Sequence, residues 1–262
     1  MKILVLPDIH GRRFWKAPCE HAERYDKIVF LGDYLDPYAF EGIEVSDAFS
    51  NFKEIVAFKK RHSDKVVLLL GNHDMPYFSP DYFAFSSYHC RHSMMYHDAI
   101  SKVFYKNRSL FQLAYAADGV LFTHAGVESG WLEHVVGCNS SDIEVICRTL
   151  NDLLTSPSGL LKLYYVTIER GGSDEYGSCI WADIHDLIRD KANAIGGDNE
   201  NPILRIRQVF GHTLQTDYDE NLDIVFGEAV EFANCKMLDT AKAYVLDTTD
   251  FRTTNETNDT KA

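Results

Sequence analysis

The chain has 262 residues, of which 45% are hydrophobic and 25% are charged, and its formal net charge is −13. This length and composition are typical of a single globular α/β domain with a sizeable core. No apolar run approaches the roughly 18 residues that a membrane span needs. The acidic charge argues against sequence-independent binding to nucleic acid, which requires a basic surface.

The six cysteines are scattered and form no Cys-x-x-Cys pair. The apolar start of the chain resembles a signal peptide only faintly, because Asp8 and His10 interrupt it. We therefore interpret it as a strand. Reduced thiols without a secretion signal indicate a cytoplasmic protein.

Strands and amphipathic helices alternate in the first half of the chain, as in parallel βαβ units. Apolar runs predict strands at 3–6, 28–31 and 66–70. Apolar residues near helical spacing predict helices at 12–24, 45–62 and 142–154. The helix at 45–62 carries Lys59, Lys60 and Arg61 in its last turn, where the helix dipole favours cations.

The second half has a different character. Residues 165–202 are rich in Gly, Asp, Glu and Asn and predict long loops around one helix at 184–194. Short apolar runs at 224–226, 230–232 and 243–246 predict an antiparallel finish. We expect one domain over residues 1–251, followed by a disordered polar tail over residues 252–262.

Polar motifs follow the apolar runs wherever a strand is expected to end. They are Asp8-Ile9-His10-Gly11, Gly32-Asp33-Tyr34-Leu35-Asp36, Gly71-Asn72-His73-Asp74, Thr123-His124-Ala125-Gly126 and Gly211-His212-Thr213. Because the C-terminal ends of neighbouring strands meet at one edge of a sheet, these side chains converge. Carboxylates, imidazoles and an amide oxygen suit hard or borderline divalent metals.

The order of these five motifs resembles the calcineurin-like metallophosphoesterase superfamily, and the resemblance spans residues 3–213. It implies an α/β fold in which two mixed β-sheets pack face to face with helices outside, a four-layer α/β/β/α sandwich. It also implies a dinuclear centre in which Asp8, His10 and Asp33 hold the first metal, while Asp33, Asn72, His124 and His212 hold the second. Manganese is the expected metal, with iron or zinc as alternatives.

Two further residues have expected roles beside the metals. His73 follows the ligand Asn72, so it can project beside a substrate and act as the general acid. Asp36 is expected to orient the His73 imidazole, although it can also cap the turn before Pro37. For Asp74, we expect a structural role as the cap of the Gly71–His73 turn.

The chain departs from the family pattern at three positions. Leu214 stands where many phosphodiesterases and nucleases of the superfamily have a second histidine, which resembles the Ser/Thr protein phosphatase and diadenosine tetraphosphatase branch. Pro37 replaces the arginine that this branch uses to bind phosphate, and Asp74 replaces its glutamate. Leu214 favours phosphate monoesters, whereas Pro37 and Asp74 put a protein substrate in doubt.

A phosphate-binding arginine must then come from another part of the chain. Arg170 lies in a glycine-rich loop before Trp181-Ala182-Asp183, a stretch where related phosphatases supply such an arginine. Arg12 and Arg13 are weaker candidates. The aromatic segment at 75–97 either lines the site or packs locally against the domain.

The sequence thus predicts a dinuclear metal-dependent phosphatase that hydrolyses phosphate monoesters through a metal-bridging hydroxide. Its substrate is a phosphoprotein or a small phosphorylated metabolite, with no nucleic acid or membrane as partner, and the oligomeric state stays open. The alternatives are a dinucleoside polyphosphate hydrolase and, in another class, a non-catalytic interaction module. The module is disfavoured because all six ligands and His73 are present.

Overall fold

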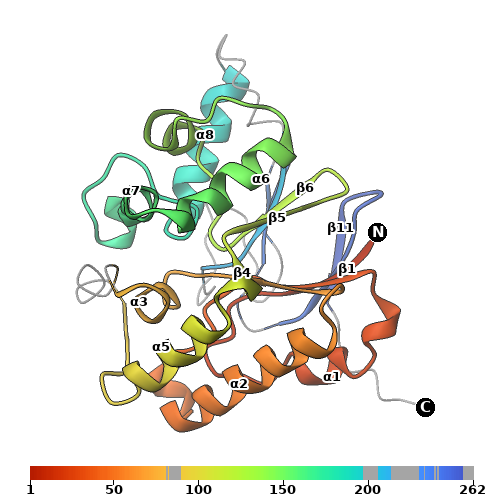
Figure 1. Ribbon diagram of the computed structural model, residues 1–262. Coiled ribbons are helices and arrows are strands. Elements are labelled where there is room, and N and C mark those ends of the chain that lie inside the picture. Colours follow the sequence, from red (N-terminus) through yellow and green to blue (C-terminus); the bar gives the residue numbers. More distant parts are fainter. Residues whose placement is uncertain are drawn as a thin grey trace.

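The computed structural model describes residues 1–80, 82, 90–196, 206–213, 230–232, 234–238, 240 and 242–255. Its architecture is the predicted one, with two mixed sheets packed face to face and helices on both outer surfaces (Figure 1). The described residues contain no helix with the length and apolar character that crossing a membrane requires.

The first sheet has six strands in the order β11-β10-β1-β2-β3-β4. Their bounds are β1 Lys2–Leu6, β2 Lys27–Phe30, β3 Val66–Leu69, β4 Phe111–Gln112, β10 Tyr244–Asp247 and β11 Arg252–Asn255. Strands β1 to β4 are parallel to one another, and β10 and β11 join them as an antiparallel hairpin. Strands β1, β2 and β3 therefore end at the same edge.

The second sheet has five strands in the order β5-β6-β7-β9-β8. Their bounds are β5 Ala114–Ala117, β6 Val120–Thr123, β7 Arg207–Phe210, β8 Val230–Phe232 and β9 Cys235–Met237. Strands β6 and β7 are parallel, so their C-terminal ends also share one edge.

The alternation of side chains along each strand divides the core into layers. Ile3, Val29 and Phe122 lie in the cluster between the two sheets, where both inner faces meet. Leu4 and Phe30 point to the opposite side of the first sheet. Each strand is apolar on both faces because both faces are covered.

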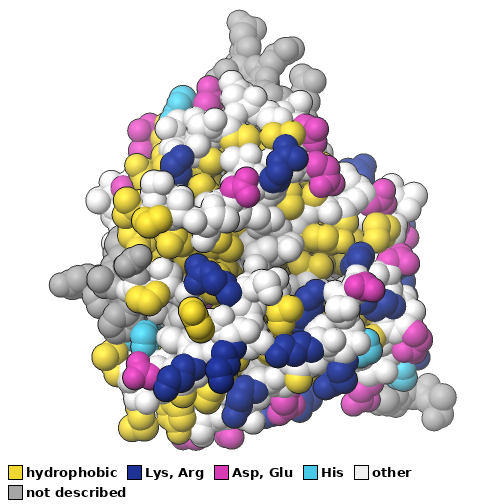
Figure 2. Space-filling view, viewed as in Figure 1, with side chains coloured by type: hydrophobic (Ala, Val, Ile, Leu, Met, Phe, Trp, Pro, Cys, Tyr) yellow, Lys and Arg dark blue, Asp and Glu magenta, His cyan; other side chains and the backbone are white. Residues whose placement is uncertain are grey.

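Seven α-helices occur in the described part of the chain: α1 Lys16–Cys19, α2 Val45–Arg61, α3 Met75–Phe78, α5 His97–Lys106, α6 Ile143–Asp152, α7 Pro157–Leu161 and α8 Ile184–Gly196. Helices α2 and α5 cover the first sheet, whereas α6 and α8 cover the second (Figure 1). Basic side chains are frequent over the first helical layer, at the bottom of the view in Figure 2, although the whole chain is acidic.

The helices predicted at 45–62, 142–154 and 184–194 are confirmed as α2, α6 and α8. The helix predicted over 12–24 is wrong, since that stretch forms the four-residue α1 and a 3₁₀ turn at Ala22–Arg24. Pro18 explains the difference, because it has no N–H to donate within a continuous helix.

The predicted disordered tail is also wrong where it begins. Residues Arg252–Asn255 form β11, which pairs with β10 in antiparallel register. Thr253 and Thr254 are β-branched and suit a strand. Residues 256–262, like the strand predicted at 224–226, lie outside the described residues.

Candidate metal centre

The five motifs predicted from the sequence lie together where the ends of the two sheets meet. Asp8 and His10 follow β1, Asp33 follows β2 and Asn72 follows β3, while His124 and His212 follow β6 and β7. All of these side chains are almost fully buried except that of His212, which is half-buried. The structure therefore brings all six predicted ligands to one site.

Asp33 lies at the centre of this group. Two sets of acidic and imidazole side chains have donor atoms within 4.8 Å of one another, and they are Asp8, His10 and Asp33 on one side and Asp33, His124 and His212 on the other. One oxygen, Asp33 Oδ2, lies 3.4 Å from His10 Nε2 and 3.5 Å from His124 Nε2. A single carboxylate is thus shared by both sets.

Backbone carbonyl groups fix the orientation of two of the imidazoles. His10 Nδ1 donates to the Leu35 carbonyl oxygen at 2.8 Å, and His124 Nδ1 donates to that of Leu31 at 2.9 Å. In a neutral ring each Nε2 then carries a lone pair, and both lone pairs face Asp33. This arrangement is the usual support of a histidine that binds a metal.

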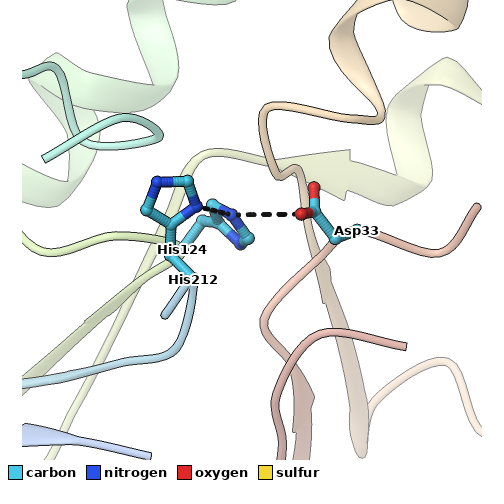
Figure 3. A group of neighbouring side chains, drawn as sticks. All are labelled: Asp33, His124 and His212. Carbon is cyan, nitrogen blue, oxygen red and sulfur yellow. Dashed lines mark hydrogen bonds and ion pairs between the residues drawn. The ribbon is translucent and has the colours of Figure 1, made fainter. Parts of the chain in front are cut away.

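Asn72 Oδ1 and His212 Nδ1 each lie 3.0 Å from His124 Nε2. Figure 3 shows the side chains of Asp33, His124 and His212 pointing toward one another from separate segments of the chain. Several lone pairs converging in a buried space repel one another unless a cation lies among them. The oxygen and nitrogen donors present here therefore fit divalent metals.

Burial keeps two of the candidate metal-binding histidines, His10 and His212, in the neutral form. Loss of solvent lowers the pKa of His10 to about 3. Burial, together with the nearby Arg170, lowers the pKa of His212 well below its usual value. Both rings are therefore neutral at pH 7, the form that binds metals.

His73 behaves differently although it is equally buried. Burial acts to lower its pKa, but the Asp33 and Asp36 carboxylates outweigh burial and the pKa is raised. His73 Nδ1 lies 3.1 Å from Asp36 Oδ2 and 3.1 Å from the Arg91 carbonyl oxygen. These acceptors occupy Nδ1, so Nε2 is the ring nitrogen left for other partners.

The backbone is strained at the site. His10, Asp33, Asp36 and His212 all have positive φ angles, from 43° to 70°, which residues with a Cβ atom rarely adopt. Such strain persists where surrounding contacts over-determine the conformation, and it clusters at functional sites.

Asp74 supplies some of these contacts. Its Oδ2 accepts the N–H groups of Asp33 at 2.7 Å and Gly71 at 2.9 Å, and its Oδ1 accepts that of Tyr34 at 3.0 Å. The predicted cap of the Gly71–His73 turn is confirmed, and Asp74 also joins this turn to the loop after β2. The two loops approach so closely that a Cβ atom on Gly71 would lie 2.2 Å from Asp33 Oδ1.

A cavity of about 320 Å³ opens beside these residues. Its walls are formed by His10, Asp33, Tyr38, Asn72, His73, Arg91, Glu169, Arg170, Trp181 and His212. The Arg170 guanidinium is held by an ion pair with Asp183 at 2.7 Å and by Thr213 Oγ1. The predicted arginine therefore does reach the site, with the Trp181–Asp183 stretch beside it.

Arg12 and Arg13 are not among the cavity residues. Arg12 pairs with Glu41 at 2.6 Å, and Arg13 pairs with Glu54 at 2.9 Å on the surface. Phe78 and Tyr82 of the aromatic segment are buried in the core, where they pack locally. Tyr77 is also buried, and its hydroxyl group contacts Asp36. Phe83, Phe85 and Tyr88 lie outside the described residues.

Sequence reasoning missed two residues of the cavity wall, Arg91 and Tyr38. The Arg91 guanidinium stacks over the Tyr38 ring at 4.0 Å and donates to the Asp36 carbonyl oxygen at 3.2 Å. Tyr38 had a detectable signal, because it follows Pro37 at the point where the family arginine is absent. Arg91 had none, since no motif surrounds it.

The chain is similar to one protein family and to several solved structures. The family model described as calcineurin-like phosphoesterase matches residues 1–215. One of these is the structure of a cold-active protein tyrosine phosphatase that is 13% identical to this chain. The alignment covers 97% of this chain and 78% of the phosphatase chain, with a TM-score of 0.54. This likeness supports the fold alone.

A second structure, of the cold-active protein-tyrosine phosphatase of a psychrophilic Shewanella species, is 14% identical. The alignment covers 98% of this chain and 80% of that one, with a TM-score of 0.48. Among curated proteins, none matches the chain significantly.

The role of Asp74 predicts a large loss of stability in Asp74→Asn. The amide cannot accept all three backbone N–H groups, and each buried donor left unpaired costs roughly 1–3 kcal/mol. Chemical denaturation should therefore give a free energy of unfolding lower by about 2–4 kcal/mol. The control is Asp98→Asn, whose side chain is 93% exposed and which should unfold like the wild type. Equal stability of both variants would contradict the assignment.

Proposed function

Because the chain belongs to the calcineurin-like phosphoesterase family, we propose that it is a dinuclear metal-dependent phosphatase acting on phosphate monoesters. The observation that carries this proposal is the position of Asp33 Oδ2 between His10 and His124, in two donor sets that share Asp33. Asp8, His10 and Asp33 would hold the first metal. Asp33, Asn72, His124 and His212 would hold the second.

Manganese is the metal that we propose, and iron or zinc also suits mixed oxygen and imidazole ligands. Two bound cations would supply a nucleophile at neutral pH and neutralise charge at phosphorus. The two carboxylates, Asp8 and Asp33, do not cancel the charge of two divalent ions. The site would therefore attract a phosphate dianion even in a protein with a net charge of −13.

His73 is the proposed general acid. Its Nδ1 is held by Asp36 and by a backbone carbonyl group, so Nε2 is the atom that can give a proton to the leaving oxygen. Cations beside Asp33 would offset the effect of that carboxylate on the His73 pKa. Asp36 would then be the main group that favours the imidazolium form.

Arg170 and Arg91 are the proposed phosphate-binding residues. Both line the cavity, and both are held by protein contacts that limit their side-chain freedom. A guanidinium group can donate two parallel hydrogen bonds to phosphate oxygens. Arg91 would replace the family arginine that is absent at Pro37.

The substrate that we propose is a small phosphorylated metabolite or a single phosphorylated side chain. A cavity of about 320 Å³ is at the small end of ligand pockets. The Gly32–Asp36 motif supports a relationship to the Ser/Thr protein phosphatase and diadenosine tetraphosphatase branch. Six free cysteines are consistent with a reducing cytoplasmic setting.

A substrate panel tests the proposal. With Mn²⁺ present, the protein should hydrolyse p-nitrophenyl phosphate at least roughly tenfold faster than bis(p-nitrophenyl) phosphate. A phosphopeptide and a dinucleoside tetraphosphate in the same panel separate the remaining substrate classes. Comparable turnover of monoester and diester would overturn the monoester assignment.

The Asp33→Ala variant should be inactive on the same substrates and should bind fewer metal ions than the wild type. The physical reason is that the variant removes the one carboxylate that both metals would share. Metal analysis measures the ion content, and the exposed variant Asp98→Ala is the control. Two ions bound to an active Asp33→Ala protein would refute the role of Asp33 as the shared ligand.

His73→Asn should leave the metals in place and lower kcat by roughly 10²–10⁴-fold. The loss should be smaller for p-nitrophenyl phosphate, whose leaving group needs little protonation, and larger for alkyl phosphates. Asp36→Asn should give a milder loss in the same direction, because it disturbs the acid without removing it. Equal losses for aryl and alkyl esters would rule out the acid role.

Arg91→Ala and Arg170→Ala should each raise KM for p-nitrophenyl phosphate and Ki for inorganic phosphate by roughly tenfold, since each removes a charged hydrogen-bond donor. Lysine in place of either arginine should restore little of the affinity for phosphate, because it lacks the paired N–H geometry of a guanidinium group. Arg13→Ala is the matched control, because Arg13 lies in a surface ion pair away from the cavity. An unchanged Ki in Arg91→Ala would exclude Arg91 from phosphate binding.

A further inference from the structure

The hydroxyl group of Tyr77 connects two parts of the site that are otherwise separate. Tyr77 lies in α3, directly after the Gly71–Asp74 turn, and is 2% exposed. Its O–H donates to Asp36 Oδ1 at 2.6 Å, and its oxygen accepts the Ser93 N–H at 2.8 Å. A hydroxyl group can donate and accept at once, so both bonds form together.

The first bond gives a hydrogen-bond donor to one of the two carboxylate oxygens of Asp36, Oδ1. Its other oxygen, Oδ2, lies 3.1 Å from His73 Nδ1. Asp36 is nearly fully buried, so a carboxylate oxygen without a donor would cost free energy and would be free to reorient. Tyr77 therefore fixes the carboxylate plane, and with it the direction in which Asp36 receives the imidazole N–H. Burial and the nearby Asp36 raise the pKa of Tyr77, so the hydroxyl keeps its proton.

The second bond holds the segment of residues 90–93. This segment also contacts the catalytic turn, because the Arg91 carbonyl oxygen lies 3.1 Å from His73 Nδ1 and Cys90 Sγ donates to the Asn72 carbonyl oxygen at 3.4 Å. The Nδ1–H group of the His73 ring thus has two acceptors at equal distance. Tyr77 contacts the carboxylate that provides one of them and the segment that provides the other.

We propose that Tyr77 is a positioning residue, which acts through Asp36 and the 90–93 segment to hold the His73 imidazole with Nε2 toward the substrate. This inference rests on the proposed function of His73, although the orientation of the ring can be measured without any activity. The competing explanation is that Tyr77 only fills space in the core.

The kinetic test uses Tyr77→Phe, which keeps the ring and removes the hydroxyl. A hydrogen bond to a charged group accounts for roughly a tenfold change, so kcat for an alkyl phosphate such as O-phosphoserine should fall roughly tenfold. For p-nitrophenyl phosphate the loss of kcat should be less than about threefold, because little protonation is needed. KM should stay within about twofold for both esters.

Tyr34→Phe is the matched control. Tyr34 is fully buried and its hydroxyl donates to the Leu69 carbonyl oxygen at 2.7 Å, so the variant loses a comparable bond in the core. Any change that Tyr34→Phe makes in kcat should be the same for both esters. Equal losses for both esters in Tyr77→Phe, or the same selective loss in Tyr34→Phe, would overturn the proposal.

A double-mutant cycle tests whether Tyr77 acts through Asp36. Adding Tyr77→Phe to Asp36→Asn should lower kcat for the alkyl ester less than Tyr77→Phe alone does, because the route through Asp36 is already altered and only the contact with residues 90–93 remains. Fully additive effects would contradict the route through Asp36.

Nitrogen NMR of the His73 imidazole reports the state of the ring without any measurement of activity. In the zinc-loaded wild type, Nδ1 of His73 should be protonated, and the signal is identified by its absence in His73→Asn. Tyr77→Phe should shift or broaden this signal, whereas Tyr34→Phe should not. An unchanged His73 signal in Tyr77→Phe would refute the positioning role even if the wild type proved to hydrolyse no phosphate ester.

Discussion

The geometry of the site depends on one buried carboxylate that does not face the cavity. Asp74 accepts three backbone N–H groups, two from the loop after β2 and one from the loop after β3. It therefore sets the distance between Asp33 in one loop and Asn72 and His73 in the other. The backbone N–H group of His73 then donates to Asp33 Oδ1 at 2.9 Å, which leaves Asp33 Oδ2 facing His10 and His124. A backbone bond and a side-chain cap together determine which oxygen is shared.

The histidines show how one residue type acquires two kinds of chemistry. His10 and His124 donate Nδ1–H to backbone carbonyl groups, and burial lowers the pKa of His10. His73 faces a carboxylate instead, and its pKa rises despite burial. The Asp33 and Asp36 carboxylates together raise the His73 pKa, and Asp36 is also a hydrogen-bond partner of its Nδ1. Asp36 has a φ of 58°, a conformation that most residues avoid.

The predictable part of the site is the part that short motifs encode. Each of the six candidate ligands lies within a few residues of a strand end, so the strand pattern alone placed them at one edge. The layers of the two sheets were implied by the resemblance of the five motifs to the family. Arg91, which was missed, reaches the cavity through a tertiary contact. Arg91 and Tyr77 lie 55 and 41 residues from Asp36, their shared partner, and no local pattern indicates either contact. The error at 12–24 had a local cause, because the apolar spacing was helical but Pro18 was given too little weight.

The Pro37-Tyr38 pair brings a positive charge to the cavity from a distant part of the chain. Proline cannot supply a guanidinium group, and the following Tyr38 turns its ring toward His10, with ring centroids 5.0 Å apart. That ring then offers a face on which Arg91 stacks at 4.0 Å, while the carbonyl group of Asp36 accepts one of its N–H groups at 3.2 Å. A cation over an aromatic face is stabilised most where water is excluded. The Pro37-Tyr38 pair therefore provides a position for a positive charge from elsewhere in the chain. The same Asp36 contacts His73, Tyr77 and Arg91, so the positions of the acid and of this charge are tied to one residue.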